Sequence, residues 1–551
     1  MSRPSDHIDS APPAPINQPE LGLVGYARFF WRQLTSMRTA LFLLLLLALA
    51  AIPGSLVPQR SSDPNGVVQY FESNPGLAPV LDAVQLFDVY GSVWFSAIYL
   101  LLFVSLIGCV IPRTAHHLKA LRSRPPRTPA RLERLEAFTV REIPTTSGLS
   151  TTDAPSPAEA IESARELLAS RRYRVEEYEV RGAPSVSAER GYLRETGNLV
   201  FHTALLGVLV SVGLGGSFAY NGQKVIIEGA PFVHVLGSYD SFNPGRFFDE
   251  TDLEPFVLTL DRFDVDYEEF NLNAYGRPGN FRASVTARYP SGEESSGVVQ
   301  VNHPFEVGGT KVYLLGNGYA PTITVRDGEG NIAFNRAVPF LPQDAELTSL
   351  GVIKAPDAVP EQLGMIGFFY PTAGLLSTGA YASAHADLLD PLLTLRVYTG
   401  DLGLDDGIPI SVFTLDTDDL TEIVGGDSGV ESIELRPGET AELPDGLGSV
   451  TFESMTADPG PGNWAGSVKR FASFDVHYNP AEWGALTFAI LALLGLLCSL
   501  FVPRRRVWVK AAELAGGGIR LEYAGLARGE DPGLADAVAE LADTHRDMVK
   551  R

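Results

Sequence analysis

Four long apolar stretches divide the chain. None contains Asp, Glu, Lys or Arg, and each is 19 to 21 residues long; they occupy residues 39–57, 93–111, 199–219 and 483–502. A helix needs about 20 such residues to cross a bilayer. The stretches therefore predict a multi-pass α-helical membrane protein with four spans.

Residues 220–482, between the third and fourth stretches, show a different pattern. Runs such as PFVLTLDRFDVDY and NFRASVTARYP alternate or are rich in β-branched residues, and Gly and Pro turns separate them. A period of two is typical of half-buried strands. We predict a large β-rich domain of one or two antiparallel sheets packed as a sandwich. Residues 359–390 and 416–429 are expected to be loops or helical insertions.

Residues 112–196, between the second and third stretches, predict a smaller unit. A basic helix over 113–134, broken by two prolines, precedes a segment in which strands flank one helix. Ser156 and Glu159 have the spacing of a capping box at the start of that helix. This mini α/β domain shows no catalytic constellation.

The remaining segments are short. Residues 1–27 begin with a Pro-, Ser- and Ala-rich stretch and are predicted to be disordered. The first membrane segment then extends over 28–57, and the loop 58–92 is expected to form short interfacial helices. The tail, 503–551, contains an amphipathic helix whose apolar face carries Leu534, Val538 and Leu541.

Basic residues set the expected orientation. They cluster before the first span, after the second and after the fourth, and these three positions share one side if four spans alternate. Lys and Arg favour the cytoplasmic side of a membrane. We therefore expect both termini and the small α/β insertion to be cytoplasmic. The β-rich domain is expected to be extracytoplasmic, in a protein of the bacterial cytoplasmic membrane.

Acidic residues gather in the β-rich segment. Residues 220–482 hold 14 Lys and Arg against 39 Asp and Glu, a net charge of −25, while the whole chain carries −23. Such a surface is unsuited to nucleic acid and to docking on anionic lipid. It suits a soluble, self-repelling domain or one that meets a basic partner protein.

The chain has two cysteines, Cys109 and Cys498, both near the expected cytoplasmic ends of apolar stretches. The β-rich segment has no cysteine and therefore no disulfide framework, and the chain has no C-x-x-C motif for thiol exchange. An unpaired buried cysteine behaves as a small apolar side chain. We expect both to serve packing.

One histidine, His202, lies inside the third apolar stretch, LVFHTALLGVLVSVGLGGSFA. An ionisable residue in a span is costly and marks a functional site by default, and imidazole is well suited to holding iron. The alternative is a histidine that only hydrogen-bonds a neighbouring helix, and the segment favours neither. Close helix approach is expected at four glycines: Gly207, Gly213, Gly215 and Gly216.

Other chemistry-bearing motifs are absent from the sequence. It has no phosphate loop, zinc-site spacing, nucleophile elbow or Rossmann glycine pattern, so no self-sufficient active site is predicted. The β-rich segment contains four histidines that are far apart in sequence and receive no ligand role: His234, His303, His385 and His477.

Several stretches resemble the ResB (CcsB) family of system II cytochrome c biogenesis. They are MRTALFLLLLLALAAIPGSLVPQ and LFDVYGSVWFSAIYLLLFVSLIGCVIPR at the first two spans, GNLVFHTALLGVLVSVGLG at the third, and VNHPFEVGGTKVYLLGNGYAPTITVRDGEG in the β-rich domain. The resemblance covers most of residues 28–510. The four-span layout, with a large domain before the last span, agrees with it.

The resemblance implies delivery of haem across the membrane and its covalent attachment to apocytochrome c. The implied partners are a haem-handling membrane subunit, ResC (CcsA), then apocytochrome c and thiol-reducing proteins. Haem b would be a transient, transported cofactor, and His202 matches the family's transmembrane axial ligand of haem iron. The five tryptophans are not clustered, so the Trp-rich haem-handling motif of ResC is absent. This chain would be a non-catalytic or co-catalytic subunit of the synthase that supplies placement.

Two other functions fit the layout. The chain could be a cofactor-free, membrane-anchored extracytoplasmic scaffold for an assembly complex, in which His202 only packs. It could also be a transporter subunit, but the four spans show no internal repeat and no second intramembrane charge. A haem absorption band on the purified protein separates the haem-binding function from the scaffold.

Overall fold

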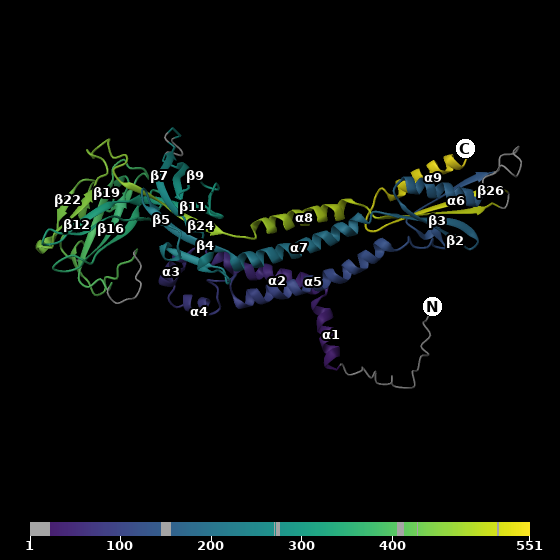
Figure 1. Ribbon diagram of the computed structural model, residues 1–551, viewed down its shortest axis with the longest axis horizontal. Helices are drawn as coiled ribbons and strands as arrows, with labels where there is room; N and C mark the ends of the chain where they lie inside the picture. Colours follow the sequence, from purple (N-terminus) through teal and green to yellow (C-terminus); the bar gives the residue numbers. More distant parts are fainter. Residues whose placement is uncertain are drawn as a thin grey trace, which may run out of the picture. The chain divides into compact units, whose positions relative to one another are not determined.

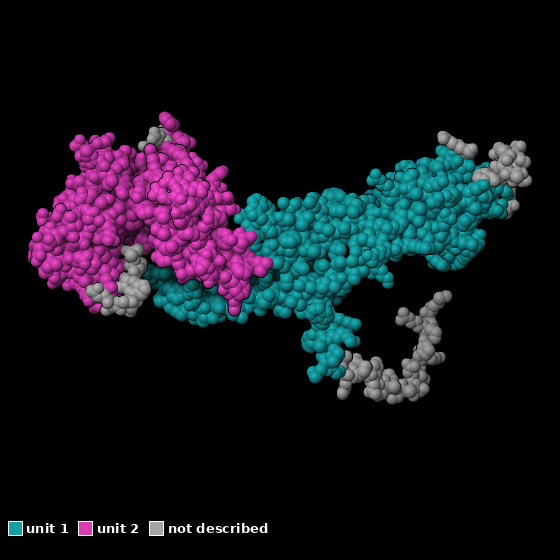
Figure 2. Space-filling model, viewed as in Figure 1, with its two compact units in different colours: residues 1–213, 481–551 teal, residues 214–480 magenta. Residues whose placement is uncertain are grey.

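The computed structural model describes residues 22–144, 156–268, 270–271, 276–404, 413–426, 428–514 and 517–550. The chain divides into two compact units, coloured separately in Figure 2: residues 1–213 with 481–551, and residues 214–480. We call them the membrane unit and the β-rich unit. The predicted N-terminal disorder lies mostly outside the described residues, but helix α1 (Leu23–Leu34) begins within that segment.

Within the described residues, four helices are long and apolar enough to cross a bilayer (Figure 1): α2 (Met37–Leu56), α5 (Val93–Arg122), α7 (Leu193–Phe218) and α8 (Glu482–Phe501). They coincide with the predicted spans and confirm the multi-pass helical fold.

Helix α5 is longer than its apolar stretch, because the span and the basic segment after it form one continuous helix through Pro112. The basic segment predicted as a helix over 113–134 is helical only as far as Arg122, as the continuation of the span. The helix ends at Arg122, shortly before Pro125, because the residue preceding a proline disfavours helical backbone angles.

The loop between α2 and α5 folds on a small apolar core. Two short helices, α3 (Pro64–Ser73) and α4 (Ala78–Ala83), pack around the buried ring of Phe87, as the sequence predicted for this loop. The buried amide of Gln59 donates to the carbonyls of Val57 and Leu86 and accepts from the Val89 N–H. These three hydrogen bonds satisfy the side chain and hold the two ends of the loop together.

A five-stranded antiparallel sheet forms the small α/β domain. Its strands follow the order β1-β26-β25-β3-β2, and two helices that contact each other pack against the sheet. The elements are β1 (Ala137–Pro144), α6 (Pro157–Ser170), β2 (Arg174–Val180), β3 (Ala183–Arg190), β25 (Arg505–Glu513), β26 (Gly518–Ala527) and α9 (Leu534–Val549). The predicted capping box of Ser156 and Glu159 opens α6.

The tail thus supplies two of the five strands and one helix of this domain, which the sequence did not predict. The predicted apolar face of the tail helix is confirmed, because Leu534, Val538 and Leu541 are buried in the core beneath α9. Residues before α7 and residues after α8 share one sheet. The chain therefore returns, after α8, to the side of the membrane from which it entered α7.

The β-rich unit contains five antiparallel sheets in its described residues, more than the one or two that were predicted. Two of them share one apolar core. Their strands are β10 (Phe305–Val307), β11 (Thr310–Ala320), β24 (Lys469–Tyr478), β4 (Tyr220–Ile227) and β6 (Ser241–Pro244) in one sheet, and β5 (Pro231–Val233), β7 (Val257–Tyr267), β8 (Pro278–Arg288) and β9 (Glu294–Val299) in the other.

Two further sheets of this unit enclose a second core, rich in buried Phe and Leu. Their strands are β13 (Ile332–Ala337), β12 (Thr322–Arg326), β23 (Ser449–Glu453) and β22 (Thr440–Glu442), then β14 (Leu341–Pro342), β15 (Ser349–Ala355), β16 (Leu363–Tyr370), β19 (Leu392–Thr399), β20 (Thr421–Val424) and β21 (Ile433–Leu435). A hairpin of β17 (Ala373–Leu375) and β18 (Tyr381–Ser383) is the fifth sheet.

The two segments predicted as loops or helical insertions contain strands β16 and β20. Strand β16 reads LGMIGFFY, a nearly continuous apolar run with two glycines, so it lacks the alternation that reveals a half-buried strand. A Cβ at Gly367 would lie 2.7 Å from the Thr394 carbonyl oxygen of the neighbouring strand. Glycine is therefore needed where that backbone approaches closely.

Candidate functional site

His202 lies in α7 with one ring nitrogen already bonded. Its Nδ1 is 2.8 Å from the carbonyl oxygen of Asn198, one helical turn earlier. A carbonyl only accepts, so Nδ1 carries a proton and donates, which leaves Nε2 as the nitrogen that can bind a metal. Among the described residues Nε2 has no hydrogen-bond partner.

This arrangement suits an axial ligand. Histidines that bind metals commonly donate their other ring N–H to a backbone carbonyl, which fixes the tautomer and the ring orientation. The ring of Phe201 lies edge-on to His202, with centroids 5.0 Å apart. A porphyrin supplies four nitrogens to haem iron, so a single imidazole from this chain would be enough to fill one of the two remaining positions. The residues present therefore fit one side of a haem iron.

Glycines bring α7 and α8 into backbone contact just below His202. A Cβ at Gly197 would lie 2.7 Å from the Gly495 carbonyl oxygen, and a Cβ at Gly495 would lie 2.6 Å from the Phe201 nitrogen. Such distances are possible only without side chains at both positions. The α8 helix therefore braces the turn of α7 that carries His202.

The predicted glycine contacts are partly correct. Gly207 faces the ring of Phe488 on α8, and Gly213 faces the hydroxyl of Tyr99 on α5. No atom would lie within 4 Å of a Cβ at Gly216, so that part of the prediction was wrong. The Tyr99 hydroxyl also donates to the Leu209 carbonyl, which ties α5 to α7.

A buried ionic cluster sits at the start of α7, and the sequence analysis missed it. The guanidinium of Arg504 binds the carboxylate of Glu189, with 2.6 Å between Nη2 and Oε1, and these side chains are 6% and 4% exposed. Arg504 also forms an ion pair with Glu195, as does Arg528. Arg506 Nε donates to the same Glu189 oxygen at 2.9 Å. We call these five residues the arginine cluster.

The cluster holds Glu189 in the charged form. Burial acts to raise the pKa of Glu189, but hydrogen bonds from Arg506 and Arg504 outweigh it, and the pKa lies below its ordinary value. The Tyr192 hydroxyl donates to the other Glu189 oxygen at 3.0 Å. Burial, and then this bond, raise the pKa of Tyr192. A basic run after the last span can be seen in the sequence, but its acidic partners have no local signal.

The two cysteines are separate and unoxidised. Cys109 donates to the carbonyl oxygen of Thr35, with 2.9 Å between Sγ and O, and Cys498 lies 3.4 Å from that of Leu193. Both contacts link one helix to a neighbouring segment, and neither side chain is fully exposed. Their positions agree with the packing role that the sequence suggested.

Among the histidines of the β-rich unit, His234 is fully packed. Its ring stacks on Phe256, with centroids 4.3 Å apart, and its Nδ1 donates to the Glu254 carbonyl at 2.8 Å. Burial lowers the pKa of His234, so the ring is neutral near pH 7. These contacts give His234 a structural role in the domain core.

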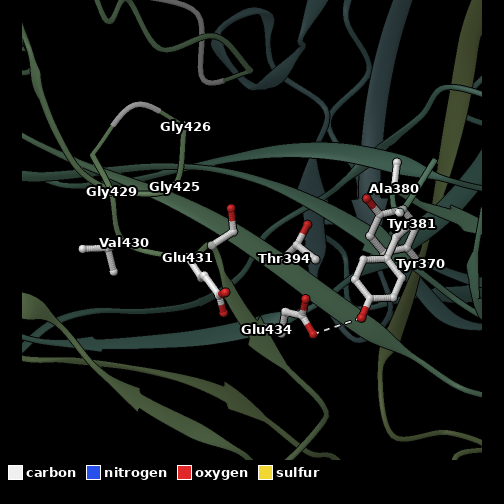
Figure 3. Close-up of a pocket in the computed structure, with 12 residues that line it drawn as sticks. Tyr370, Ala380, Tyr381, Thr394, Gly425, Gly426, Gly429, Val430, Glu431 and Glu434 are labelled. Atoms are coloured by element: carbon white, nitrogen blue, oxygen red, sulfur yellow. Dashed lines mark hydrogen bonds between the residues drawn. The ribbon is translucent and has the colours of Figure 1, made fainter.

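The β-rich unit has an open cavity of about 640 Å³ on the sheet that contains β16, β19 and β21. Figure 3 shows the rings of Tyr370 and Tyr381 on one side and the carboxylates of Glu431 and Glu434 on the other. The Tyr381 hydroxyl donates to Glu434 at 3.1 Å. This aromatic and acidic lining suits an extended basic segment of another protein.

Comparison with known proteins gives a consistent answer. Cytochrome c biogenesis proteins CcsB from Synechococcus sp. strains WH7803 and CC9311 are each 27% identical to the chain, over 300 and 304 residues. The aligned parts cover 54% of this chain in both cases, and 62% and 61% of those relatives. The CcsB of Thermosynechococcus vestitus is 25% identical over 313 residues, which cover 56% of this chain and 62% of that protein.

The chain thus spans about three fifths of the length of the curated relatives that it matches. The sequence model of the ResB-like family matches residues 37–539. That match includes all four membrane helices, the β-rich unit and the first part of α9, so it reaches further into the tail than the resemblance seen in the sequence. The chain therefore belongs to the ResB-like family.

Proposed function

We propose that this protein acts in cytochrome c biogenesis, as the subunit of a system II synthase that holds haem within the membrane. The observation that carries the proposal is the state of His202, whose Nδ1 is bonded to Asn198 while Nε2 is free to bind iron. His202 supplies one axial ligand, and a histidine of the haem-handling partner subunit, ResC (CcsA), supplies the other. Haem is the cargo, and it supplies the vinyl groups that react with thiols.

The chain itself positions the imidazole that binds haem and the apocytochrome segment that receives it. Helices α5 and α8 fix the depth and rotation of α7, and so of the imidazole. The β-rich unit holds the apocytochrome segment that receives haem. Its net charge of −25 over residues 220–482 and its acidic cavity favour a basic substrate.

The orientation belongs to the same proposal. The basic residues at the end of α5 and after α8 favour a cytoplasmic small α/β domain, which would put the β-rich unit outside. Attachment of haem takes place on that outer side, where reduced cysteine thiols of the apocytochrome are supplied by thiol-reducing proteins.

Absorption spectra of the purified protein test the haem site. We expect the full chain, purified with its partner, to show a haem Soret band that His202→Ala lowers strongly, with loss of c-type cytochromes in cells. Added imidazole should restore part of both signals, because it can replace the missing ligand. His116→Ala, which changes an exposed histidine of α5, is the matched control.

Two outcomes would overturn the proposal. Normal cytochrome c levels in the His202→Ala strain would show that the histidine only packs. A complete lack of haem absorption in the wild-type protein, with and without its partner, would leave the chain as a cofactor-free scaffold.

A further inference from the structure

Three arginines line a pocket at the end of the last span. The pocket has a volume of about 230 Å³ and is lined by Arg504, Arg506 and Arg528 around an apolar floor of Leu526 and Ala527. Arg504 lies between α8 and β25, Arg506 is the second residue of β25, and Arg528 follows β26. The lining therefore combines positive charge and apolar surface at the boundary of a membrane span.

Two of these arginines have N–H donors that lack a partner among the described residues. Arg506 is 38% exposed and Arg528 is 71% exposed, and each pairs with one carboxylate of the arginine cluster. A guanidinium has five N–H donors. The described residues give no partner to the Nη groups of Arg506 or to most donors of Arg528. Both arginines line a pocket whose described lining contains no carboxylate.

The pocket is coupled to the helix that carries His202. Arg504 and Arg528 both pair with Glu195, which precedes His202 by seven residues on α7. Seven residues make about two turns, roughly 10 Å of rise, so the two side chains leave the same face of the helix. An amphiphile with its acidic end at the arginines would lie along the face of α7 that leads to the imidazole.

We propose that this pocket binds the propionate carboxylates of haem. The inference rests on the proposed function, and it adds the site that recognises the polar edge of the cargo. Haem is a planar apolar ring with two carboxylates at one edge, which matches an apolar floor beneath unpaired guanidinium donors. Carboxylates accept from arginine in short, charge-assisted bonds, often in pairs. The pocket would thus orient haem before or while its iron meets His202.

Titration with haemin tests this site in the purified full chain. We expect the double variant Arg506→Gln, Arg528→Gln to bind haemin about tenfold more weakly, because charge-assisted hydrogen bonds to two carboxylates are lost. The spectrum of the bound haem should keep its axial histidine signature. Arg520→Gln is the matched control, since Arg520 lies on the same strand β26 and is outside the pocket.

A second arm needs no variant. Haemin dimethyl ester has the same ring and iron but no free carboxylates, so the wild-type protein should bind it about tenfold more weakly than haemin. The double variant should not distinguish the two ligands. This arm stays decisive even if the arginine substitutions disturb folding.

The outcomes separate this inference from the proposed function. Equal affinity of the wild-type protein for haemin and its dimethyl ester would overturn the propionate site while leaving His202 as a ligand. A complete lack of haem binding by the wild-type protein, with and without its partner, would instead overturn the proposed function. Lipids are tested as competitors in the same titration. If anionic phosphatidylglycerol competes for the pocket while neutral phosphatidylcholine does not, and haemin and its dimethyl ester bind equally well, the pocket binds a lipid phosphate and the haem assignment fails.

Discussion

Arg504 and Glu189 form a buried ion pair that joins the end of the last span to the small α/β domain. The pair connects the residue that follows α8 with strand β3, and both side chains are almost completely buried. Charges at that depth are tolerated only when they are paired and hydrogen-bonded. Arg506 and Tyr192 supply the remaining bonds to Glu189.

Removing one partner of this pair should destabilise the protein strongly. We expect Arg504→Met to lower the free energy of unfolding by about 3 kcal/mol, because buried Glu189 loses one of its two arginine partners and keeps only Arg506. Arg124→Gln is the control, since Arg124 is 80% exposed and its pair with Glu176 should contribute less than about 1 kcal/mol. Thermal unfolding of the purified protein in detergent measures both. Equal melting temperatures for the two variants would contradict the assigned importance of the buried pair.

Acid should loosen the small α/β domain. Hydrogen bonds from arginines lower the pKa of Asp531, and outweigh burial in lowering that of Glu189. Carboxyls with lowered folded-state pKa values contribute stability above their ordinary values, near pH 4, and lose it as the pH falls through the folded values. We expect the melting temperature to fall steeply below about pH 4. Asp531→Asn should flatten part of this dependence; an identical pH profile in the variant would count against the assignment.

Adding one methyl group at Gly495 should separate α7 from α8. The new Cβ would lie 2.6 Å from the Phe201 nitrogen and 2.8 Å from the Gly197 carbonyl, and backbone atoms cannot rotate away. We expect Gly495→Ala to cost about 1 to 3 kcal/mol and to reduce haem retention, since α7 carries His202. Gly216→Ala is the control, because nothing lies within 4 Å of its Cβ. A Gly495→Ala protein as stable as that control would show that the two helices are not in backbone contact.

The cysteines should be dispensable. Each donates one weak hydrogen bond to a backbone carbonyl, and they are not joined to each other. We expect the double variant Cys109→Ala, Cys498→Ala to mature cytochrome c at the wild-type level, because a thiol-to-methyl change removes little volume. Haem staining of membrane proteins measures the product. Loss of c-type cytochromes at normal abundance of the variant would reveal a thiol function.

The β-rich unit should fold alone and bind basic peptides weakly. It has no cysteine and has two apolar cores of its own, so residues 220–482 should melt at the same temperature with and without reductant. A labelled C-x-x-C-H peptide with lysines should bind better at low salt, because exposed charges are screened beyond roughly 8 Å at physiological ionic strength. Glu434→Gln should weaken binding more than Glu346→Gln, which removes an exposed carboxylate outside the cavity. Salt-independent binding, or none, would move substrate recognition to the partner subunit.

Much of the fold could be predicted because its signals are local. A charge-free run of sufficient length marks a span wherever it occurs, and alternation marks many strands of the β-rich unit. Strand β16 was not predicted because both of its faces are largely buried and its sequence is almost uniformly apolar. The role of the tail was not predicted because β25 and β26, which pair with each other, find their other neighbours, β3 and β1, in a segment more than 300 residues earlier in the chain.

The candidate site was predicted in part. His202 stands out in the sequence because it is ionisable within a span, and its iron-binding role stays a prediction. Its bond to Asn198 could not be foreseen, since a helical histidine can also turn towards a neighbour. The contact of Gly197 with Gly495 and the pairing of Arg504 with Glu189 depend on which helices are neighbours. Neither pair leaves a trace in the spacing of residues along the chain.

The strand order of the small α/β domain also determines when its sheet can form during translation. Ala137 pairs with Gly525, and Arg190 pairs with Arg505, so β1 and β3 have no contact through the sheet until the tail has been translated. Until then β2 and β3 form only a two-stranded hairpin, which is marginally stable alone, and β1 is an unpaired edge. The sheet can therefore close only after α7, the β-rich unit and α8 have all been synthesised. A ribosome that stalls anywhere within those segments leaves open strand edges, which a protease can use to recognise an incomplete chain.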